Sequence, residues 1–302
     1  MEKPARPVRS ALFVPGHRGA WIAKAPQYGA DTLILDLEDS VPKAEKVSAR
    51  AVTREGLGAL HAKGQPAGVR INGFATGLAA GDLDAVVCRE LESITLPKVE
   101  TAAELHELDR MLTDLEIRNR LPVGHVETPL LCETAQAMRN IFEIATACRR
   151  VKRVTLAAGP GGDAARAVGY QWSKGGTETL YLRSKAVLDC RAAGILYPGI
   201  TSWWNIADLE GLEKDARWNR QLGFRGQTVM HPSHVAVVNK VFTPSADEIA
   251  WYEGLVRAMD EAAHQGIAAI TYEGDMVDEA MANHAKEFLA FARSLGQKQQ
   301  CD

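Results

Sequence analysis

The segment TLILDLEDSVP, at residues 32–42, decides the fold. It begins with β-branched and aliphatic residues and then places three acids within four positions, before a turn-forming Ser-Val-Pro. A continuous apolar run bounded by a turn signal predicts a strand that is buried on both faces. Because burying an unpaired charge is costly, we expect Asp36, Glu38 and Asp39 to emerge at a polar rim where this strand ends. Asp39 or the adjacent Ser40 would also suit the N-cap of a following helix.

Seven other strand-like segments share this plan. Between them lie helix-like segments, clearest at 101–118, 133–150 and 180–193, where apolar residues recur at helical spacing. Strands that alternate with helices imply parallel pairing, and eight of them predict an α/β protein built as a closed (β/α)8 barrel, with its active site at the carboxyl ends of the strands. The predicted strands are residues 11–14, 32–38, 67–73, 93–99, 122–128, 154–159, 194–197 and 227–232.

The chain after the predicted barrel has a different pattern. Residues 1–241 match the typical size of a (β/α)8 domain. After a break at Thr243-Pro244-Ser245, the sequence predicts a helix over 247–264, a short strand, a turn, and a last helix from about Asp278 to Leu295. We expect residues 242–302 to form a lid or a contact between subunits.

Composition favours a soluble globular protein. Of the 302 residues, 46% are hydrophobic and 24% charged, and the formal net charge of −3 gives no reason to expect a nucleic acid or an anionic membrane as partner. The amino terminus lacks the apolar core of a signal peptide, and no stretch is long enough to span a bilayer. The cysteines have neither paired nor metal-type spacing, which fits a reducing cytoplasm. They are Cys88, Cys132, Cys148, Cys190 and Cys301.

Charged residues collect where the predicted strands end. Glu127 and Asp163 follow neighbouring strands, and paired carboxylates suit a hard cation that keeps several waters, as Mg²⁺ does. Each could instead cap the helix that follows it. Arg70 could bind a carboxylate or stabilise an enolate oxygen, or form a structural ion pair with the acids of the second strand. Lys98 ends the fourth predicted strand.

The stretch Gly-Pro-Gly-Gly-Asp-Ala at residues 159–164 satisfies a dinucleotide-binding pattern. The acid expected about twenty residues further on is missing, however, and there is no Walker lysine. We therefore expect these glycines to let the backbone pass close to a ligand. The pair Trp203-Trp204 is either core or the wall of a pocket, and core packing is the default for tryptophan.

A series of short motifs covers nearly the whole chain. They are RSALFVPG at 9–16, LDLEDSV at 35–41, RING at 70–73, LPKV at 96–99, VET at 126–128, GFRG at 223–226, HPS at 231–233, VFTPS at 241–245 and GDMVD at 274–278. Together they resemble the citrate lyase beta-subunit-like family of the HpcH/HpaI aldolase superfamily, which includes malyl-CoA and citramalyl-CoA lyases. Each motif is short, but the ordered set is specific.

The resemblance implies a magnesium-dependent barrel that cleaves or forms a carbon–carbon bond in a 3-hydroxyacyl-CoA thioester. The resemblance also implies an oligomer, because members of the family are commonly trimers or hexamers of identical subunits. By position, Glu127 and Asp163 resemble the two direct Mg²⁺ ligands, with Glu38 and Asp39 holding metal-bound water. Arg70 matches the arginine that faces the reacting oxygens.

The resemblance also assigns residues to the rest of the substrate. Phe13, Arg18 and Lys24 match positions that contact coenzyme A, the latter two through its phosphates. Asp278 matches an acid on the C-terminal lid that enters the site of the neighbouring subunit and gives a proton to the enolate carbon.

Two departures from the family pattern concern the substrate. The loop at 161–164 is Gly-Gly-Asp-Ala, and a common Ile-Asp-Gly after the seventh strand is replaced by Gly199-Ile200-Thr201, next to Trp203-Trp204. The acyl group therefore stays open. Open too are a thioesterase acting at the same site, a beta subunit that works on an acyl-carrier-protein thioester, and a barrel that only binds a thioester or a partner.

Overall fold

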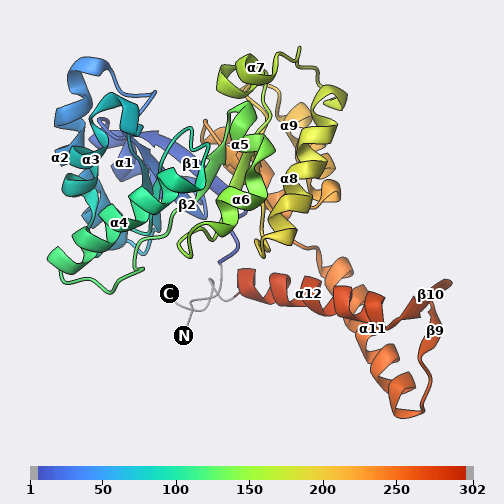
Figure 1. Ribbon diagram of the computed structural model, residues 1–302. Helices are drawn as coiled ribbons and strands as arrows, with labels where there is room; N and C mark the ends of the chain where they lie inside the picture. Colours follow the sequence, from blue (N-terminus) through green and yellow to red (C-terminus); the bar gives the residue numbers. More distant parts are fainter. Residues whose placement is uncertain (1–5, 297–302) are drawn as a thin grey trace. The chain divides into compact units, whose positions relative to one another are not determined.

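The computed structural model describes residues 6–296, and its main feature is an eight-stranded parallel sheet (Figure 1). The strands succeed one another around the sheet in sequence order, and β1 pairs with both β2 and β8. They are β1 (Ser10–Pro15), β2 (Thr32–Asp36), β3 (Ala67–Arg70), β4 (Ser93–Thr95), β5 (Leu130–Cys132), β6 (Val154–Ala157), β7 (Gly199–Thr201) and β8 (Gly226–Val229).

A short bridge joins β4 to the segment before β5 and nearly closes the sheet. Ser93 pairs in parallel with Glu127. The amide of Ile94 donates to the carbonyl of Glu127 at 2.8 Å, and the amide of Glu127 donates to the carbonyl of Glu92 at 3.0 Å. The predicted (β/α)8 architecture is confirmed, and the carboxyl ends of all eight strands lie at one rim.

Helices follow the strands and surround the sheet. The bounds are α1 (Gly19–Lys24), α2 (Lys46–His61), α3 (Ala79–Val86), α4 (Ala102–Arg118), α5 (Ala135–Arg139), α6 (Ile141–Thr146), α7 (Gly162–Val168), α8 (Leu180–Ala192), α9 (Leu209–Leu222) and α10 (Ser233–Phe242). Short 3-10 helices lie at Ala25–Tyr28, Lys43–Glu45, Phe74–Thr76 and Thr177–Thr179.

The helix α4 shows how the sequence specifies these elements. Thr101 and Glu104 form a capping box, so two backbone donors at the start of the helix are satisfied by side chains. Leu105, Leu108 and Leu112 recur at helical spacing and are buried. They join the single core that the strands and the inner helix faces share, which contains Leu33 and Leu35 of the organising strand.

Two predicted strands are displaced. The segment predicted at 122–128 contains a turn at Val123 and Gly124, where Gly124 has φ +86° and the Val123 side chain is 61% exposed, and the strand β5 begins only after Pro129. The segment predicted at 194–197 begins with the turn that ends α8, where Gly194 has φ +79°, and β7 follows at 199–201. The helix predicted over 133–150 is divided into α5 and α6 at Asn140.

The described residues form two compact units, one ending at Phe242 and one beginning at Thr243. The second contains α11 (Ala246–His264), the antiparallel strands β9 (Ala269–Tyr272) and β10 (Asp275–Asp278), and α12 (Glu279–Gly296). Its small core gathers Leu255, Met259, Val277, Ala282 and Ala285. Cys301 lies outside the described residues. Within 6–296, no helix combines the length and the apolarity that a membrane span requires.

Candidate active site

Asp36 and Arg70 are opposite each other in the register of β2 and β3, at the carboxyl ends of both strands. The Nε and Nη2 atoms of Arg70 each donate to one oxygen of Asp36 at 2.7 Å, and both side chains are buried. Asp36 also accepts from the amides of Glu38 and Ser40 at 3.0 Å. Burial alone would raise the pKa of Asp36, but these hydrogen bonds, Arg70 first, hold it below its usual value. Asp36 is therefore a charged anchor for Arg70.

The remaining nitrogen of Arg70 faces the other acids of the organising segment. Its Nη1 atom lies 3.1 Å from Glu38 and 3.7 Å from Asp39. The guanidinium carbon lies 4.7 Å from the centre of the Phe13 ring, within range of a cation–π contact. Burial alone would lower the pKa of Arg70, but the three acids raise it, so the group stays charged. Arg70 is thus fixed from several sides at the rim.

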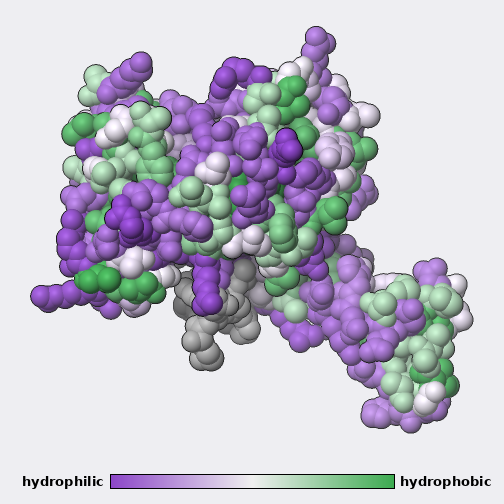
Figure 2. Space-filling view, viewed as in Figure 1, coloured by the Kyte–Doolittle hydropathy of each residue, from purple (hydrophilic) through white to green (hydrophobic). Residues whose placement is uncertain are grey.

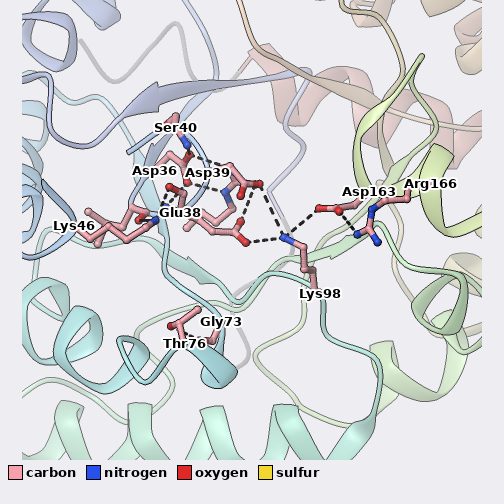
Figure 3. Close-up of polar contacts among 12 residues, drawn as sticks. Asp36, Glu38, Asp39, Ser40, Lys46, Gly73, Thr76, Lys98, Asp163 and Arg166 are labelled. Atoms are coloured by element: carbon pink, nitrogen blue, oxygen red, sulfur yellow. Dashed lines mark hydrogen bonds and ion pairs between the residues drawn. The ribbon is translucent and has the colours of Figure 1, made fainter. Parts of the chain in front are cut away.

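Lys98, three residues after β4, connects acids from two parts of the rim (Figure 3). Its Nζ atom lies 2.7 Å from Glu38, 3.1 Å from Asp163 and 4.0 Å from Asp39. Asp163 in turn lies 2.6 Å from the exposed Arg166 on α7. Hydrogen bonds from Arg166 and Lys98 lower the pKa of Asp163 against the effect of burial. The strand ends of β2, β3, β4 and β6 therefore meet in one charged network.

Trp204 lies against the glycine-rich loop that precedes Asp163. A Cβ atom on Gly159 would lie 2.9 Å from the tryptophan ring, and one on Gly162 would lie 2.8 Å from it. Gly162 also has φ +71°, which L side chains rarely adopt. The predicted close approach at these glycines is therefore to a side chain of the same chain. Of the tryptophan pair, Trp203 is buried and Trp204 is 42% exposed.

Glu133 is the acid of the rim that the sequence analysis did not single out. It directly follows β5, its side chain is buried, and its Oε1 atom has no hydrogen-bond partner among the described residues. Burial raises the pKa of Glu133 to about 7; Lys98 and Arg70 oppose the rise, and Glu38 and Asp163 add to it. These four electrostatic partners place Glu133 at the same rim. The available signal was Leu-Leu-Cys-Glu, an apolar run that ends in an acid.

The geometry does not support the prediction that Glu127 shares a metal ion with Asp163. Glu127 precedes β5 and pairs with the start of β4, so it lies at the amino-terminal end of the barrel. It faces Arg153, 3.5 Å away, which directly precedes β6. At about 3.3 Å per extended residue, the six positions from Glu127 to Glu133 span roughly 20 Å. The cause is the turn at Gly124, which interrupts the segment predicted as the fifth strand.

The residues predicted to contact coenzyme A lie near the carboxyl end of β1. Phe13 belongs to this strand and touches Arg70. Arg18 immediately precedes α1, Lys24 is the last residue of that helix, and both side chains are exposed. Their contact with coenzyme A stays a prediction.

Asp278 belongs to the second unit, at the end of β10. Its carboxylate accepts a hydrogen bond of 3.1 Å from the amide of Met281, which is the N-cap geometry for α12. Asp278 therefore has a capping role in the structure, and its catalytic role stays a prediction.

A sequence model described as HpcH/HpaI aldolase/citrate lyase matches residues 9–232, most of the barrel and every strand that contributes to this rim. The chain belongs to this family. The citrate lyase subunit beta of Leuconostoc mesenteroides subsp. cremoris is 35% identical over 95% of this chain and 93% of its own length. The L-malyl-CoA/beta-methylmalyl-CoA lyase of Cereibacter sphaeroides is 32% identical over 94% of both.

A solved structure shows the same likeness. Protein CitE from Mycobacterium tuberculosis, in complex with magnesium, acetoacetate and coenzyme A, is 30% identical, with a TM-score of 0.73 over 96% of this chain and 98% of that one. These homologues, together with the family, indicate a carbon–carbon lyase. The predicted family is confirmed.

Proposed function

We propose that the protein is a magnesium-dependent lyase that cleaves a 3-hydroxyacyl-CoA thioester, of the malyl-CoA, citramalyl-CoA or citryl type, into an acyl-CoA such as acetyl-CoA and a 2-oxo acid. The observation that carries this proposal is Arg70, anchored by Asp36 at a rim that also holds the buried Glu133 and Asp163. Cleavage of this bond needs charge stabilisation at a developing carbonyl and at an enolate oxygen. A buried, fixed guanidinium beside carboxylates suits that need.

The carboxylates of this rim fit Mg²⁺. Glu133 has a buried oxygen without a hydrogen-bond partner in the described chain, and Asp163 belongs to the same electrostatic cluster. Mg²⁺ prefers oxygen ligands and is usually held by one or two carboxylates and several waters. We therefore assign Glu133 and Asp163 as the ligands, with Glu38 and Asp39 holding water. When bound, the ion would supply Lewis-acid stabilisation to the oxygens of the substrate.

Arg70 would bind and orient the reacting oxygens. Two of its nitrogens are already engaged by Asp36, so the guanidinium needs little reorganisation to act on the substrate. Burial raises the pKa of Glu38, and the Arg70 and Lys98 cations, 3.1 and 2.7 Å from its carboxylate, oppose that rise.

Arg18 and Lys24 would hold the phosphates of coenzyme A, as the resemblance implies. Both are exposed cations close to β1, whose last residue, Pro15, pairs with Asp36 of β2. A phosphate favours such cations through charge-assisted hydrogen bonds.

We also propose that the chain forms a homotrimer or hexamer in the cytoplasm. The second unit exposes large apolar residues, and Figure 2 shows hydrophobic patches (green) among hydrophilic residues there. Exposed apolar residues of this kind support a contact between subunits. The large ones among the described residues of this unit are Ile267, Met276 and Met281. The cysteines within the described residues are free and buried, which supports a reducing compartment.

The products formed from a panel of substrates test the proposal. The protein would be incubated with Mg²⁺ and free 3-hydroxyacyl-CoA thioesters, and the products identified by mass spectrometry. We expect a 2-oxo acid together with a shorter acyl-CoA. Release of free CoA and an intact hydroxy acid would show a thioesterase instead. Conversion of carrier-protein thioesters alone, or of no thioester, would contradict the proposal.

The affinity for Mg²⁺ should depend on pH through Glu133. A carboxyl group with a pKa of about 7 is protonated below that pH, and the proton must leave before the oxygen can bind a cation. We expect the apparent affinity for Mg²⁺ to fall by about tenfold for each pH unit below 7 and to level off above about 8. Titration calorimetry of the metal-free protein between pH 5.5 and 8.5 measures this. A flat profile would show that Glu133 does not ligate the ion.

Asp278 should act in the site of another subunit. Asp278→Ala removes a cap, which costs about 1 kcal/mol of stability, and we expect it to lose turnover without losing substrate binding. Arg70→Ala should also be inactive. When the two variants are mixed and exchange subunits, part of the activity should return, because some sites combine an intact Arg70 with an intact Asp278. If no activity returns after verified subunit exchange, Asp278 does not act in the active site of another subunit.

A further inference from the structure

Among the described residues of the charged rim, Lys98 is the side chain that contacts acids from two separate parts of the barrel, after β2 and after β6. Its ammonium lies 2.7 Å from Glu38, which follows β2, and 3.1 Å from Asp163, in the first turn of α7, the helix that follows β6. Glu133, which follows β5, also contributes to the raised pKa of Lys98, in addition to Glu38 and Asp163. Asp39 lies 4.0 Å from the same ammonium, so a single compact cation faces all four acids that the proposed metal site uses.

The other cations of the rim do not occupy this position. Arg70 is committed to Asp36 by two hydrogen bonds. Arg166 meets Asp163 through the other carboxylate oxygen, and its side chain is 76% exposed to solvent. An ammonium with three donors and a concentrated charge is, of the available groups, the one most like a hydrated divalent ion.

The backbone of Lys98 indicates that its placement is specific. Lys98 has φ +55°, in the left-handed region that residues other than glycine rarely adopt. The side chain is 36% exposed, so the ammonium has access to solvent but remains with Glu38 and Asp163. Within residues 6–296, no three acidic, histidine or cysteine side chains converge closely enough to form a metal cage. This agrees with an ammonium that lies between Glu38 and Asp163 and keeps the two carboxylates apart.

We propose that Lys98 is a tethered cation that competes with Mg²⁺ for the rim carboxylates. Its ammonium neutralises Glu38 and Asp163 in the metal-free enzyme, and Mg²⁺ displaces it from Asp163 when the ion binds. Lys98 then keeps its shorter bond, to Glu38. This inference rests on the proposed Mg²⁺ site at Glu133 and Asp163. It states that Lys98 sets the affinity of that site for Mg²⁺.

Removing the positive charge of Lys98 should have two consequences. Without Lys98 the acids would repel one another in the metal-free protein, so that form should be less stable. The same acids should then bind Mg²⁺ more tightly, because no resident cation has to leave. The free energy that Mg²⁺ binding adds to folding should therefore be larger in a Lys98 variant than in the wild type.

Lys98→Met tests the proposal, with Arg166→Met as a matched control. Each change removes one positive charge next to Asp163, but only Lys98 lies between Asp163 and Glu38. By calorimetry at pH 8, we expect Lys98→Met to bind Mg²⁺ at least about thirtyfold more tightly than the wild type. Arg166→Met should change the affinity by about fivefold at most, as expected for an exposed ion pair.

Thermal unfolding in EDTA and in Mg²⁺ gives a second readout. Lys98→Met should have the lower melting temperature in EDTA and the larger increase on addition of Mg²⁺. Equal Mg²⁺ affinities of the wild type and Lys98→Met would overturn the inference, and equal shifts in the two variants would reduce it to a general charge effect. An unchanged affinity with a raised KM would make Lys98 a substrate-binding residue instead.

A measurement on the wild-type protein tests the proposal even if Lys98→Met does not fold. Reductive ¹³C-methylation of lysines gives each side chain an NMR signal, and Lys98→Arg, which keeps the charge, assigns that of Lys98. The signal should move during a Mg²⁺ titration with the same midpoint as calorimetry. If Mg²⁺ binds but the Lys98 signal does not move, the inference about Lys98 is overturned while the proposed metal site stands. No binding of Mg²⁺ by the wild type would contradict the proposed metal site itself.

Discussion

Glu133→Gln should reduce turnover by at least about a hundredfold and abolish detectable Mg²⁺ binding at pH 8. The change is nearly isosteric, but it removes the negative charge from a carboxyl group that is buried and has one oxygen without a partner in the described structure. A neutral amide at this position cannot balance a divalent ion. Because burial disfavours the charged form of Glu133, the variant should fold at least as stably as the wild type in EDTA.

Glu127→Gln is the matched control for this variant. It makes the same chemical change at an acid that sequence motifs suggest as a ligand, but at the amino-terminal end of the barrel, beside Arg153. We expect turnover and Mg²⁺ affinity within about threefold of the wild type, with at most about 1 kcal/mol of lost stability from the weakened ion pair. Steady-state kinetics and calorimetry on both variants decide between the two residues. Loss of Mg²⁺ binding in Glu127→Gln but not in Glu133→Gln would reverse the assignment.

The barrel itself was predictable from the sequence because its signals are local. The organising strand has an apolar run of the length and composition that a doubly buried strand needs. Leu33 and Leu35 on one face and Thr32 and Asp36 on the other are buried, and Ile34 is partly buried. The helix predicted at 101–118 carries its own capping box and apolar stripe, and α4 matches it to within one residue. Eight such units leave few alternatives to a closed parallel sheet.

The fifth strand was not predictable in the same way. The segment Val-Gly-His-Val-Glu contains two β-branched valines and ends in an acid, whereas Leu130–Cys132 is only three residues long. What decides between them is the positive φ at Gly124, together with pairing to β6, and neither is visible in a single sequence. A shift of six residues along the chain then assigns to Glu127 the metal-ligand role that we propose for Glu133.

The roles of the acids after β2 depended on partners far along the chain. Asp36 and Glu38 are two residues apart, so sequence spacing does not separate their roles. In the structure, Asp36 accepts hydrogen bonds from two nitrogens of Arg70, Nε and Nη2. Glu38 instead faces Lys98 and the third nitrogen of Arg70, Nη1. The register of β2 against β3 makes this division, because it places Asp36 directly opposite Arg70.

Arg70→Lys should lower kcat by about a hundredfold or more while KM changes by less than about fivefold. Lysine keeps the charge but not the planar fork, which here grips Asp36 with two nitrogens and turns a third toward Glu38. If Arg70 stabilises charge that develops in the transition state, losing this geometry reduces kcat and kcat/KM together. Steady-state kinetics with the substrate found in the panel measures both. A rise in KM at constant kcat would make Arg70 a clamp for a substrate carboxylate instead.

The stability of the pair requires its own control, because removing one partner leaves a buried charge. Arg70→Ala leaves Asp36 without its guanidinium, and breaking a buried pair in this way costs about 3–5 kcal/mol. Asp36→Asn with Arg70 intact keeps the guanidinium but loosens its anchor, so kcat should fall, by less than in Arg70→Lys, if orientation matters. Added guanidinium ion should restore part of the activity of folded Arg70→Ala, since the ion can occupy the space beside Asp36. A purely structural role predicts the opposite pattern: guanidinium would raise the melting temperature of Arg70→Ala without restoring turnover, and Asp36→Asn would lose stability but keep kcat.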